Sequence, residues 1–407
     1  MQFSLYLSIN RSVDMASSSA PTNPGTHEDP TADAASNTEP SLEIDSASDE
    51  SDSAYGEGHS TYTISANSSV FNFRFENGRR YHGYAEGEYL MPNDDVEMDR
   101  LDLQHHAFRL TLDGQLYRAP IPKDVQRVLD VGCGTGIWSI QFADEHPSAQ
   151  VLGTDLSPIQ PDQVPPNCEF LIDDCTKEWI FHNLFDFIHT RAMVTSIKDW
   201  SRLFEQAYVN LKSGGYIECQ ELTFPIKCMD PGVTADNSPL MQWSDLLFEA
   251  AVKNGLDATG PRHFALKLRN VGFVGVNVKT YKWPLGKWAK GARFKLLGRF
   301  VYEDLWDGLP SLSLGLFTRV LQWSREEVEV LLAECRQEMK RKDRHYYAEA
   351  YVKPILYSWI YLLIRSVSFG MHRSPKVSAS HTPEMTTYRT KSYWSLTKKT
   401  KQIRCLD

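Results

Sequence analysis

The stretch RVLDVGCGTG at residues 127–136 constrains the fold more than any other part of this chain. It begins as an apolar strand pattern and continues through three alternating glycines, Gly132, Gly134 and Gly136. A strand that turns into a helix through glycines lets backbone N–H groups approach a ligand closely, as nucleotide-binding α/β folds do. The dinucleotide fingerprint requires GxGxxG, and Ile137 stands where its last glycine would be. The spacing therefore disfavours a dinucleotide site.

Apolar strand patterns alternate with helical patterns after this stretch. The expected strands cover residues 127–132, 150–156, 168–174, 185–191 and 215–222. Strands separated by helices form a parallel sheet with crossover helices, so we predict an α/β, Rossmann-like fold. We further expect a largely helical insertion at residues 223–265, two more strands at 274–282 and 345–352, and between those a helix that starts with a Ser324–Glu327 capping box.

Acidic residues stand at the ends of the first three expected strands. A carboxylate at Asp155, where the second strand ends, can accept both hydroxyls of a ribose. The acids Asp173 and Asp174 end the third strand, where one of them can accept from an adenine amino group. This pattern suits a positively charged nucleoside without phosphate, and S-adenosylmethionine is such a compound. The candidate cofactor-binding residues are Asp130, Gly132, Gly134, Gly136, Asp155, Leu156, Asp174 and Cys175.

Five motifs in sequence order carry a family resemblance. VLDVGCGTG, GTDLSP, FLIDDC, FDFIHTR and LKSGGYIE resemble the motifs of class I S-adenosylmethionine-dependent methyltransferases. RRYHGYAEGEYLMPNDDVEMDRLDLQHHAF, DLSPIQPDQVPPNCEFLIDDCTKEW and WPLGKWAKGARFKLLG resemble the LaeA-like methyltransferases of filamentous fungi. The resemblance covers about residues 71–352. Two departures are Cys133, where many relatives have Thr, and the sequence after Val352, where the family continues into a short ending with Gly and Lys.

The resemblance implies a seven-stranded class I methyltransferase sheet with its last strand antiparallel and S-adenosylmethionine above the carboxyl ends of the strands. It also implies a regulator of secondary metabolism or development, located in the nucleus and working with velvet-type partners. A cytoplasmic location stays open. Two other functions also stay open: a cofactor-binding docking module with little turnover, and a small-molecule O-methyltransferase of a biosynthetic cluster. An NAD-dependent oxidoreductase is disfavoured by Ile137 and the acids.

Methyl transfer is an in-line displacement, so positioning of donor and acceptor supplies much of the acceleration. A general base is needed only if the acceptor arrives protonated. The candidates near the methyl group are His189, Arg191, Glu218 and Glu221, at the ends of the fourth and fifth strands. A lone histidine in an apolar strand is more often structural, so we favour that interpretation for His189.

Two groups of side chains ahead of the glycine loop invite interpretation. Tyr81, Tyr84 and Tyr89 either form a lid with an aromatic face near the sulfonium or pack against the sheet edge, and the sequence favours neither. The adjacent pair His105 and His106 does not have the spacing of metal ligands on a helix, so we expect no metal site there.

The two ends of the chain differ in charge. Residues 1–60 contain eleven acidic residues and one arginine, whereas residues 353–407 contain ten basic and two acidic residues. We predict a disordered acidic leader at 1–60, an N-terminal lid or helical segment at 61–126 and a methyltransferase domain at 127–352. Two alternatives remain for residues 353–407: a basic tail, or sequence translated past a splice site.

Composition excludes several function classes. The central part of the chain is mildly acidic and lacks the basic face that direct nucleic-acid binding requires. The seven cysteines form no CxxC pair, which indicates a reducing compartment and no zinc site. No apolar run approaches the roughly 20 residues that a membrane-spanning helix needs.

Overall fold

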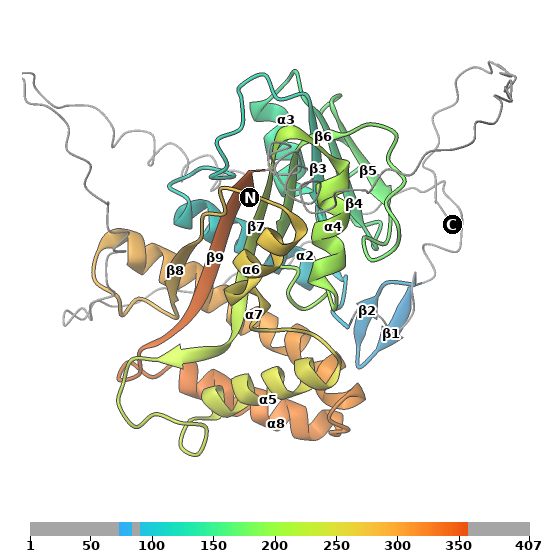
Figure 1. Cartoon of the computed structure of the whole chain (residues 1–407). Coiled ribbons are helices and arrows are strands. Elements are labelled where there is room, and N and C mark those ends of the chain that lie inside the picture. Colours follow the sequence, from blue (N-terminus) through green and yellow to red (C-terminus); the bar gives the residue numbers. More distant parts are fainter. Residues whose placement is uncertain (1–72, 84–89, 357–407) are drawn as a thin grey trace, which may run out of the picture. The chain divides into compact units, whose positions relative to one another are not determined.

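The computed structural model describes residues 73–83 and 90–356, which contain a seven-stranded sheet, helices against it and a small hairpin (Figure 1). The neighbouring strands are, in order, β5 (Cys168–Ile172), β4 (Gln150–Asp155), β3 (Arg127–Val131), β6 (Phe185–Arg191), β7 (Leu211–Cys228), β9 (Tyr346–Leu356) and β8 (Lys279–Pro284). The first five are parallel, and β9 runs antiparallel to both of its neighbours. This confirms the Rossmann-like fold with an antiparallel last strand.

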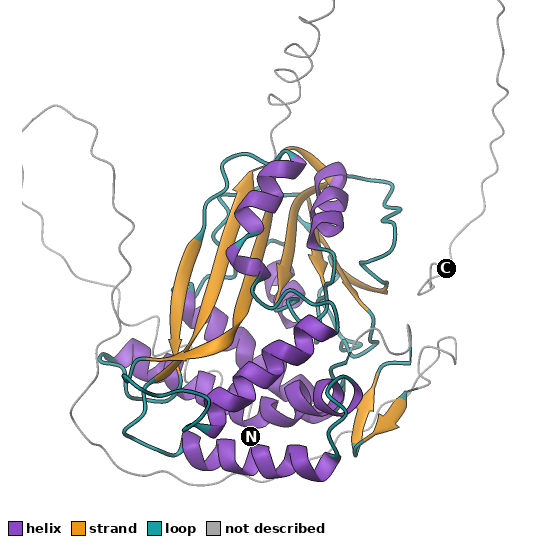
Figure 2. Cartoon of the chain, turned by 60° about the horizontal axis from the view of Figure 1, so that its bottom comes forward, coloured by secondary structure: helices purple, strands orange, loops and turns teal. Residues whose placement is uncertain are grey.

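The two faces of the sheet bury alternate residues of each strand, as the pleat requires. Val128 and Phe187 pack under α3 (Ile137–Glu145) on one face. Leu129 and Ile188, one residue further along, pack on the opposite face beneath α4 (Trp200–Asn210) and α6 (Phe264–Val271). Figure 2 shows helices flanking the sheet. Both faces are covered, which explains the continuous apolar runs of these strands.

A layer of helices forms the largest core cluster beyond the sheet. Its helices are α2 (Asp95–Thr111), α5 (Pro239–Lys253), α7 (Ala292–Arg319) and α8 (Arg325–Met339), of which α5, α7 and α8 lie together at the bottom of Figure 1. The capping box predicted for α8 is confirmed, because Ser324 and Glu327 each bond the other's backbone. The hairpin consists of β1 (Arg74–Glu76) and β2 (Arg79–Tyr81), and a short 3₁₀ turn, η1 (Gly260–Arg262), precedes α6.

Helix α7, for which no prediction was made, is long and contains Pro310 and three glycines. These glycines allow close approach of other backbone. A Cβ atom at Gly298 would lie 1.9 Å from the carbonyl oxygen of Gly286, and one at Gly315 would lie 2.4 Å from that of Leu90. The residues that lower helix propensity therefore make the packing of this helix possible.

The structure corrects three predicted boundaries. Strand β7 continues to Cys228, through the start of the segment predicted to be helical, and the first helix of that segment begins at Pro239. Strand β8 begins at Lys279 rather than at residue 274. Strand β9 does not stop at Val352 but continues to Leu356.

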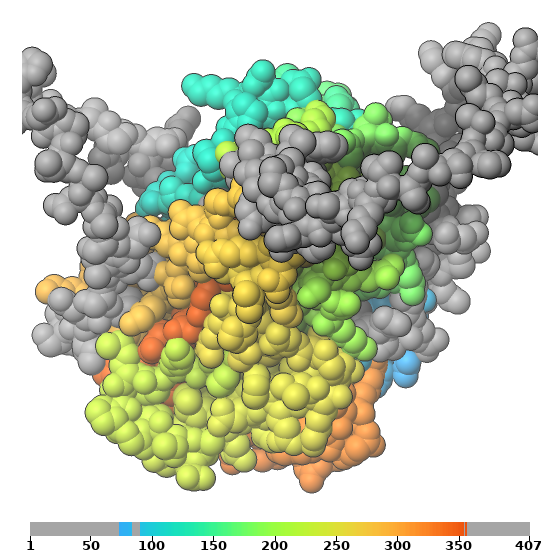
Figure 3. Space-filling model, in the orientation of Figure 1, coloured from blue at the N-terminus to red at the C-terminus, as the bar shows by residue number. Residues whose placement is uncertain are grey.

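The end of β9 belongs to the core of the sheet. Lys353 and Ile355 are each 0% exposed, and they pair with Cys219 and Ile217 of β7. Ile355 shares a core cluster with Phe264 of α6, and the gold segment that contains α6 packs against the red strand β9 in Figure 3. Residues 353–356 are thus part of the fold and not of the basic segment that follows. The predicted acidic leader and the residues from 357 onward lie outside the described residues.

Candidate active site

The glycine loop between β3 and α3 has the backbone that its sequence predicts. Gly132, Gly134 and Gly136 all have positive φ angles, of 68°, 56° and 79°. A Cβ atom at Gly136 would lie 2.4 Å from the ring of Phe170, and one at Gly132 would lie 2.2 Å from the sulfur of Met193. Both conformation and space therefore favour glycine at these positions.

Asp155, at the end of β4, holds this loop in place. One carboxylate oxygen accepts the N–H of Gly134 at 2.9 Å, and the other accepts the N–H of Ser157 at 2.9 Å. The Gln160 side chain of the SPIQP segment donates to the carbonyl oxygen of Gly134 at 2.6 Å. Asp155 and the adjacent Leu156 are half-buried. Because each carboxylate oxygen has a second lone pair, Asp155 keeps the capacity to accept two ribose hydroxyls.

The end of β5 lies beside the end of β4, as the prediction required. The N–H of Asp173 donates to the carbonyl oxygen of Asp155 at 3.0 Å. Asp174 is 4% exposed, and one of its oxygens accepts both the N–H and the hydroxyl of Thr176. Cys175 is half-buried, and its carbonyl oxygen accepts the Trp179 indole N–H at 3.0 Å. The structure brings Asp155, Asp173 and Asp174 to one edge, with Asp173 the more open of the last two.

Asp130 does not have the role that the sequence suggested. It is 2% exposed, and its two oxygens bond the Ser139 hydroxyl at 2.6 Å and the Nδ1 atom of His189 at 2.8 Å. Strand alternation turns this side chain toward the α3 face of the sheet, beneath the glycine loop. We therefore correct its assignment: Asp130 supports the loop from below and is not a direct ligand contact.

Helix α2, which lies within the predicted N-terminal lid or helical segment, and the residues before it contact the loop and the end of β4, and the individual residues of these contacts were not predicted. Thr135 donates its hydroxyl hydrogen to Asp102 at 2.6 Å, and Leu101 would lie 3.5 Å from a Cβ atom at Gly134. Asn93 bonds the Ser157 hydroxyl at 3.3 Å. Helix α2 is far from the loop in sequence and carries no local signal of this contact.

The acids around the loop fit a cationic cofactor. Burial raises the pKa of Asp155, of Asp102 and of Asp173 above the usual value of an aspartate. A positive charge placed among them would favour their ionised forms and offset that burial. The sulfonium of S-adenosylmethionine would supply such a charge, and Asp155 has the free lone pairs that the ribose hydroxyls would need. The described residues around the loop thus fit this cofactor.

His189 is enclosed within the protein. It is 0% exposed, and its ring stacks on Trp138 with the centroids 3.8 Å apart. Burial lowers the pKa of His189, although Asp130 opposes this shift. This histidine therefore supports the sheet under α3 and does not reach an acceptor.

Arg191 contacts helix α2 instead of an open cleft. Its guanidinium lies 3.0 Å from the Nδ1 atom of His105 and 5.5 Å from the centre of the Phe108 ring. Burial lowers the pKa of Arg191 to about 10, so it stays charged at neutral pH. The arginine joins the end of β6 to α2 and thereby helps to place α2 over the glycine loop.

Glu218 and Glu221, both candidates near the methyl group, do not converge on one cleft. Strand β7 continues without a turn through both residues, so their side chains lie on opposite faces of the sheet. Glu218 accepts the N–H groups of Arg118 and Ala119, and Glu221 accepts those of Met193 and Val194. Burial raises their pKa to about 7 and about 8. Both carboxylates anchor loops.

The predicted lid and the histidine pair have structural positions. Tyr81, at the end of hairpin strand β2, is 2% exposed, and the guanidinium of Arg319 lies over its ring, 5.1 Å from the ring centre. This tyrosine therefore has a packing position in the structure. Tyr84 and Tyr89 lie outside the described residues. The Nε2 atom of His105 lies 3.0 Å from the side-chain oxygen of Gln141. Within residues 73–83 and 90–356, no group of three or more His, Cys, Asp or Glu side chains is placed to hold a metal ion.

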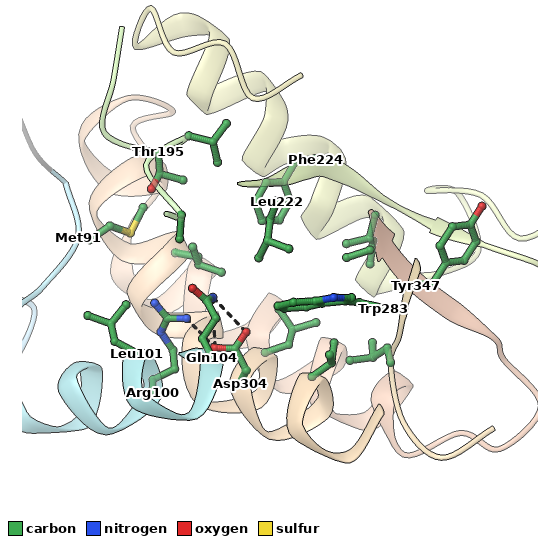
Figure 4. Close-up of a pocket in the computed structure, with 18 of the residues that line it drawn as sticks. Met91, Arg100, Leu101, Gln104, Thr195, Leu222, Phe224, Trp283, Asp304 and Tyr347 are labelled. Atoms are coloured by element: carbon green, nitrogen blue, oxygen red, sulfur yellow. Dashed lines mark hydrogen bonds and ion pairs between the residues drawn. The ribbon is translucent and has the colours of Figure 1, made fainter. Parts of the chain in front are cut away.

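An apolar pocket lies beside the glycine loop, between α2, the segment after β6, β7, β8, β9 and α7 (Figure 4). Its cavity volume is about 100 Å³. Leu101, Thr195 and Met91 line one end, whereas Trp283 and Tyr347 line the other. The lining comes from elements that are distant in sequence, so no single motif indicates it.

The end of the pocket near Leu101 is also the end near the glycine loop. The sulfur of Met193 reaches Gly132, and Ala192 and Val194, on either side of it in sequence, line the pocket. Ala192 has a φ angle of 55°, which is rare for a residue other than glycine. Backbone strain of this kind concentrates at functional sites. The segment after β6 thus forms the wall between the loop and the pocket.

Comparisons with known proteins show the family of this chain. Residues 103–278 match the methyltransferase domain family. The chain is 38% identical to the methyltransferase pytC of Aspergillus terreus, over 69% of this chain and 87% of that protein. It is 34% identical to the secondary metabolism regulator LAE1 of Cochliobolus heterostrophus, over 68% of this chain and 92% of that protein. The YcgJ structure from Bacillus subtilis aligns with a TM-score of 0.37 and 14% identity, over 62% of this chain and 99% of that chain. From the sequence relatives, this chain belongs to the LaeA-like family of class I S-adenosylmethionine-dependent methyltransferases.

Proposed function

We propose that this enzyme methylates an acceptor that binds in the apolar pocket beside the glycine loop. Bound S-adenosylmethionine supplies a methyl group on a positively charged sulfur. The acceptor's electron pair forms the new bond to carbon, the carbon–sulfur bond breaks, and its electron pair stays on the sulfur of S-adenosylhomocysteine. The observation that carries this proposal is the position of the pocket, which shares Leu101 and the residues around Met193 with the glycine loop.

The chain's own contribution is to position the two reactants and to exclude water. Asp155 and the glycines fix the cofactor side, while apolar residues from α2, β7 and α7 enclose the acceptor side. Holding reacting atoms in line replaces a bimolecular encounter by a step within one complex, which lowers the entropic part of the barrier.

The pocket's acidic groups are not free to act as bases. Glu97 and Asp304 are the carboxylates among the lining residues, and both bond Arg100. The proposal therefore concerns acceptors whose reacting atom carries no proton. Such acceptors need positioning rather than a catalytic base.

The test uses a variant that fills the pocket. Leu222 lines its centre, so Leu222→Trp should block the acceptor and leave cofactor binding intact (Figure 4). Leu184→Trp is the matched control, because Leu184 is exposed. Methyl transfer from radiolabelled cofactor to an organic extract of a filamentous fungus is measured, and calorimetry reports S-adenosylmethionine binding. Loss of transfer in Leu222→Trp alone supports the proposal, whereas equal transfer by all three proteins contradicts it.

We further propose that the enzyme acts in the nucleus with velvet-type partners, in the control of secondary metabolism or development. Its support is the similarity to a relative named a secondary metabolism regulator. Fluorescent tagging tests the location. Affinity capture from nuclear extract, with wild-type protein and with Gly134→Asp, tests the partners. Capture of velvet-type proteins by both would separate docking from cofactor binding, and capture by neither would contradict the partner proposal.

A further inference from the structure

A tryptophan that lines the apolar pocket carries a buried hydrogen-bond donor without a partner among the described residues. Trp283 of β8 is 1% exposed, and its indole Nε1 atom bonds no acceptor within the described part of the chain. The ring lies across the pocket, at the end away from Leu101 (Figure 4). A buried N–H group without an acceptor is costly, and nearly all such groups in folded proteins are paired. A ligand oxygen in the pocket would supply the missing acceptor.

The charged groups of the pocket are already paired with one another. Arg100 donates to both carboxylate oxygens of Glu97, at 2.6 and 3.0 Å, and to Asp304 at 2.7 Å. Gln104 also donates to Asp304, at 3.3 Å. These three ionised side chains are the charged residues of the described lining, and they sum to one negative charge. An anionic ligand would find no free cation here and would be repelled by the excess carboxylate.

Building on the proposed function, we propose that the acceptor is an uncharged, largely apolar molecule with a hydrogen-bond-accepting oxygen, and that Trp283 selects it by donating its indole N–H to that oxygen. The two ends of the pocket then have different roles. The end at Leu101 and Ala192 receives the atom to be methylated, next to the glycine loop. The end at Trp283 receives the oxygen and sets the orientation. Trp283 is thus a positioning and specificity residue and takes no part in bond making.

Three probes of similar shape separate these claims. 2-Acetylnaphthalene is neutral and carries a carbonyl oxygen, 2-ethylnaphthalene lacks the oxygen, and 2-naphthoate is an anion. Calorimetry measures the binding of each to the full chain saturated with S-adenosylhomocysteine. One buried hydrogen bond changes an affinity by about tenfold. We expect the acetyl compound to bind about tenfold more tightly than the ethyl compound, and naphthoate to bind at least tenfold more weakly than the acetyl compound.

Trp283→Phe is the decisive variant, because it removes the N–H and keeps an aromatic ring. It should abolish the preference for the acetyl compound and leave the affinity of the ethyl compound unchanged. Leu285→Met, at a neighbouring lining residue, is the control and should keep the preference. Circular dichroism and retained S-adenosylhomocysteine binding establish that each variant is folded.

The outcomes distinguish this inference from the proposed function on which it rests. If both neutral probes bind with equal affinity, or if the preference survives in Trp283→Phe, the role of Trp283 is refuted and the pocket stays the acceptor site. Binding of naphthoate as tight as that of the acetyl compound refutes the charge selection. If neither neutral probe binds to the folded complex, the pocket does not take acceptors, and both proposals fail.

Discussion

Replacing Asp155 should weaken S-adenosylmethionine binding far more than it weakens the fold. Its carboxylate is half-buried at the end of β4 and has lone pairs left after accepting from Gly134 and Ser157. Two ribose hydroxyls that donate to an ionised acceptor contribute about 1.5 kcal/mol each, so Asp155→Ala should cost about 3 kcal/mol of binding. That loss corresponds to a dissociation constant raised roughly 100-fold.

Calorimetric titration of the full chain with S-adenosylmethionine measures this loss directly. Asp162→Ala serves as the control, because Asp162 is an exposed aspartate on the segment that follows β4. It should bind the cofactor as the wild type does. Asp155→Asn keeps the side-chain shape and one acceptor oxygen, so its dissociation constant should lie between those of the wild type and of Asp155→Ala. An unchanged dissociation constant in a folded Asp155→Ala protein would refute the placement of the ribose.

Further predictions concern the loop, the acids and the last strand. Gly134→Asp should abolish cofactor binding, because a bulky carboxylate would occupy a left-handed backbone position against the ligand; retained binding in a titration would remove the loop from the site. At acid pH, the affinity for S-adenosylmethionine should fall more than the affinity for S-adenosylhomocysteine. Only S-adenosylmethionine carries the sulfonium, whose positive charge favours the ionised forms of Asp102, Asp155 and Asp173. Parallel pH profiles of the two affinities would contradict this prediction. Burial raises the pKa of Glu218 and Glu221 to about 7 and about 8, so near neutral pH the folded state holds protons that the unfolded state releases. The free energy of unfolding, measured by urea titration, should therefore fall by on the order of 1 kcal/mol from pH 7 to pH 8. A rise in that free energy would refute this prediction. A chain ending at residue 352 should unfold at a lower temperature than one ending at 356, because it lacks the buried Ile355; equal melting temperatures would place the end of β9 outside the fold.

Local sequence predicts the glycine loop and the ends of β4 and β5, because each of these parts is specified by neighbours in the chain. The strands β3, β4 and β5 are short apolar runs, and each ends in residues with a clear chemical role, such as the glycines after Val131 and the acid Asp155. Gln160, to which no role was assigned, lies in the DLSPIQP stretch that resembles the LaeA-like family, and its side chain donates to the carbonyl oxygen of Gly134 in the glycine loop. Strand ends of a parallel sheet meet at one edge, so a linear pattern is enough to place them.

The parts that sequence missed depend on contacts between distant segments. Asp130 and Asp155 are both acids at the ends of strands, yet the first is enclosed by His189 and Ser139 and the second faces the loop. Which face of the sheet a residue occupies decides its role, and a motif does not state the face. No prediction was made for helix α7, whose glycines admit other backbone, as at Gly298, although glycine lowers helix propensity.

The two halves of the site are therefore under different constraints. A change at Gly132 or Gly136 meets a steric conflict inside the loop, so the cofactor half tolerates little substitution. The pocket draws Leu222 and Trp283 from β7 and β8, two strands outside the glycine loop, so under the proposed function each could change in size without meeting the loop directly. Under the proposed function, substitution in the pocket would alter which acceptor fits while the methyl donor stays the same. This separation gives a physical reason why one methyltransferase fold can serve different acceptors. If the proposed function holds, the pocket, rather than the shared motifs, determines the acceptor of this enzyme.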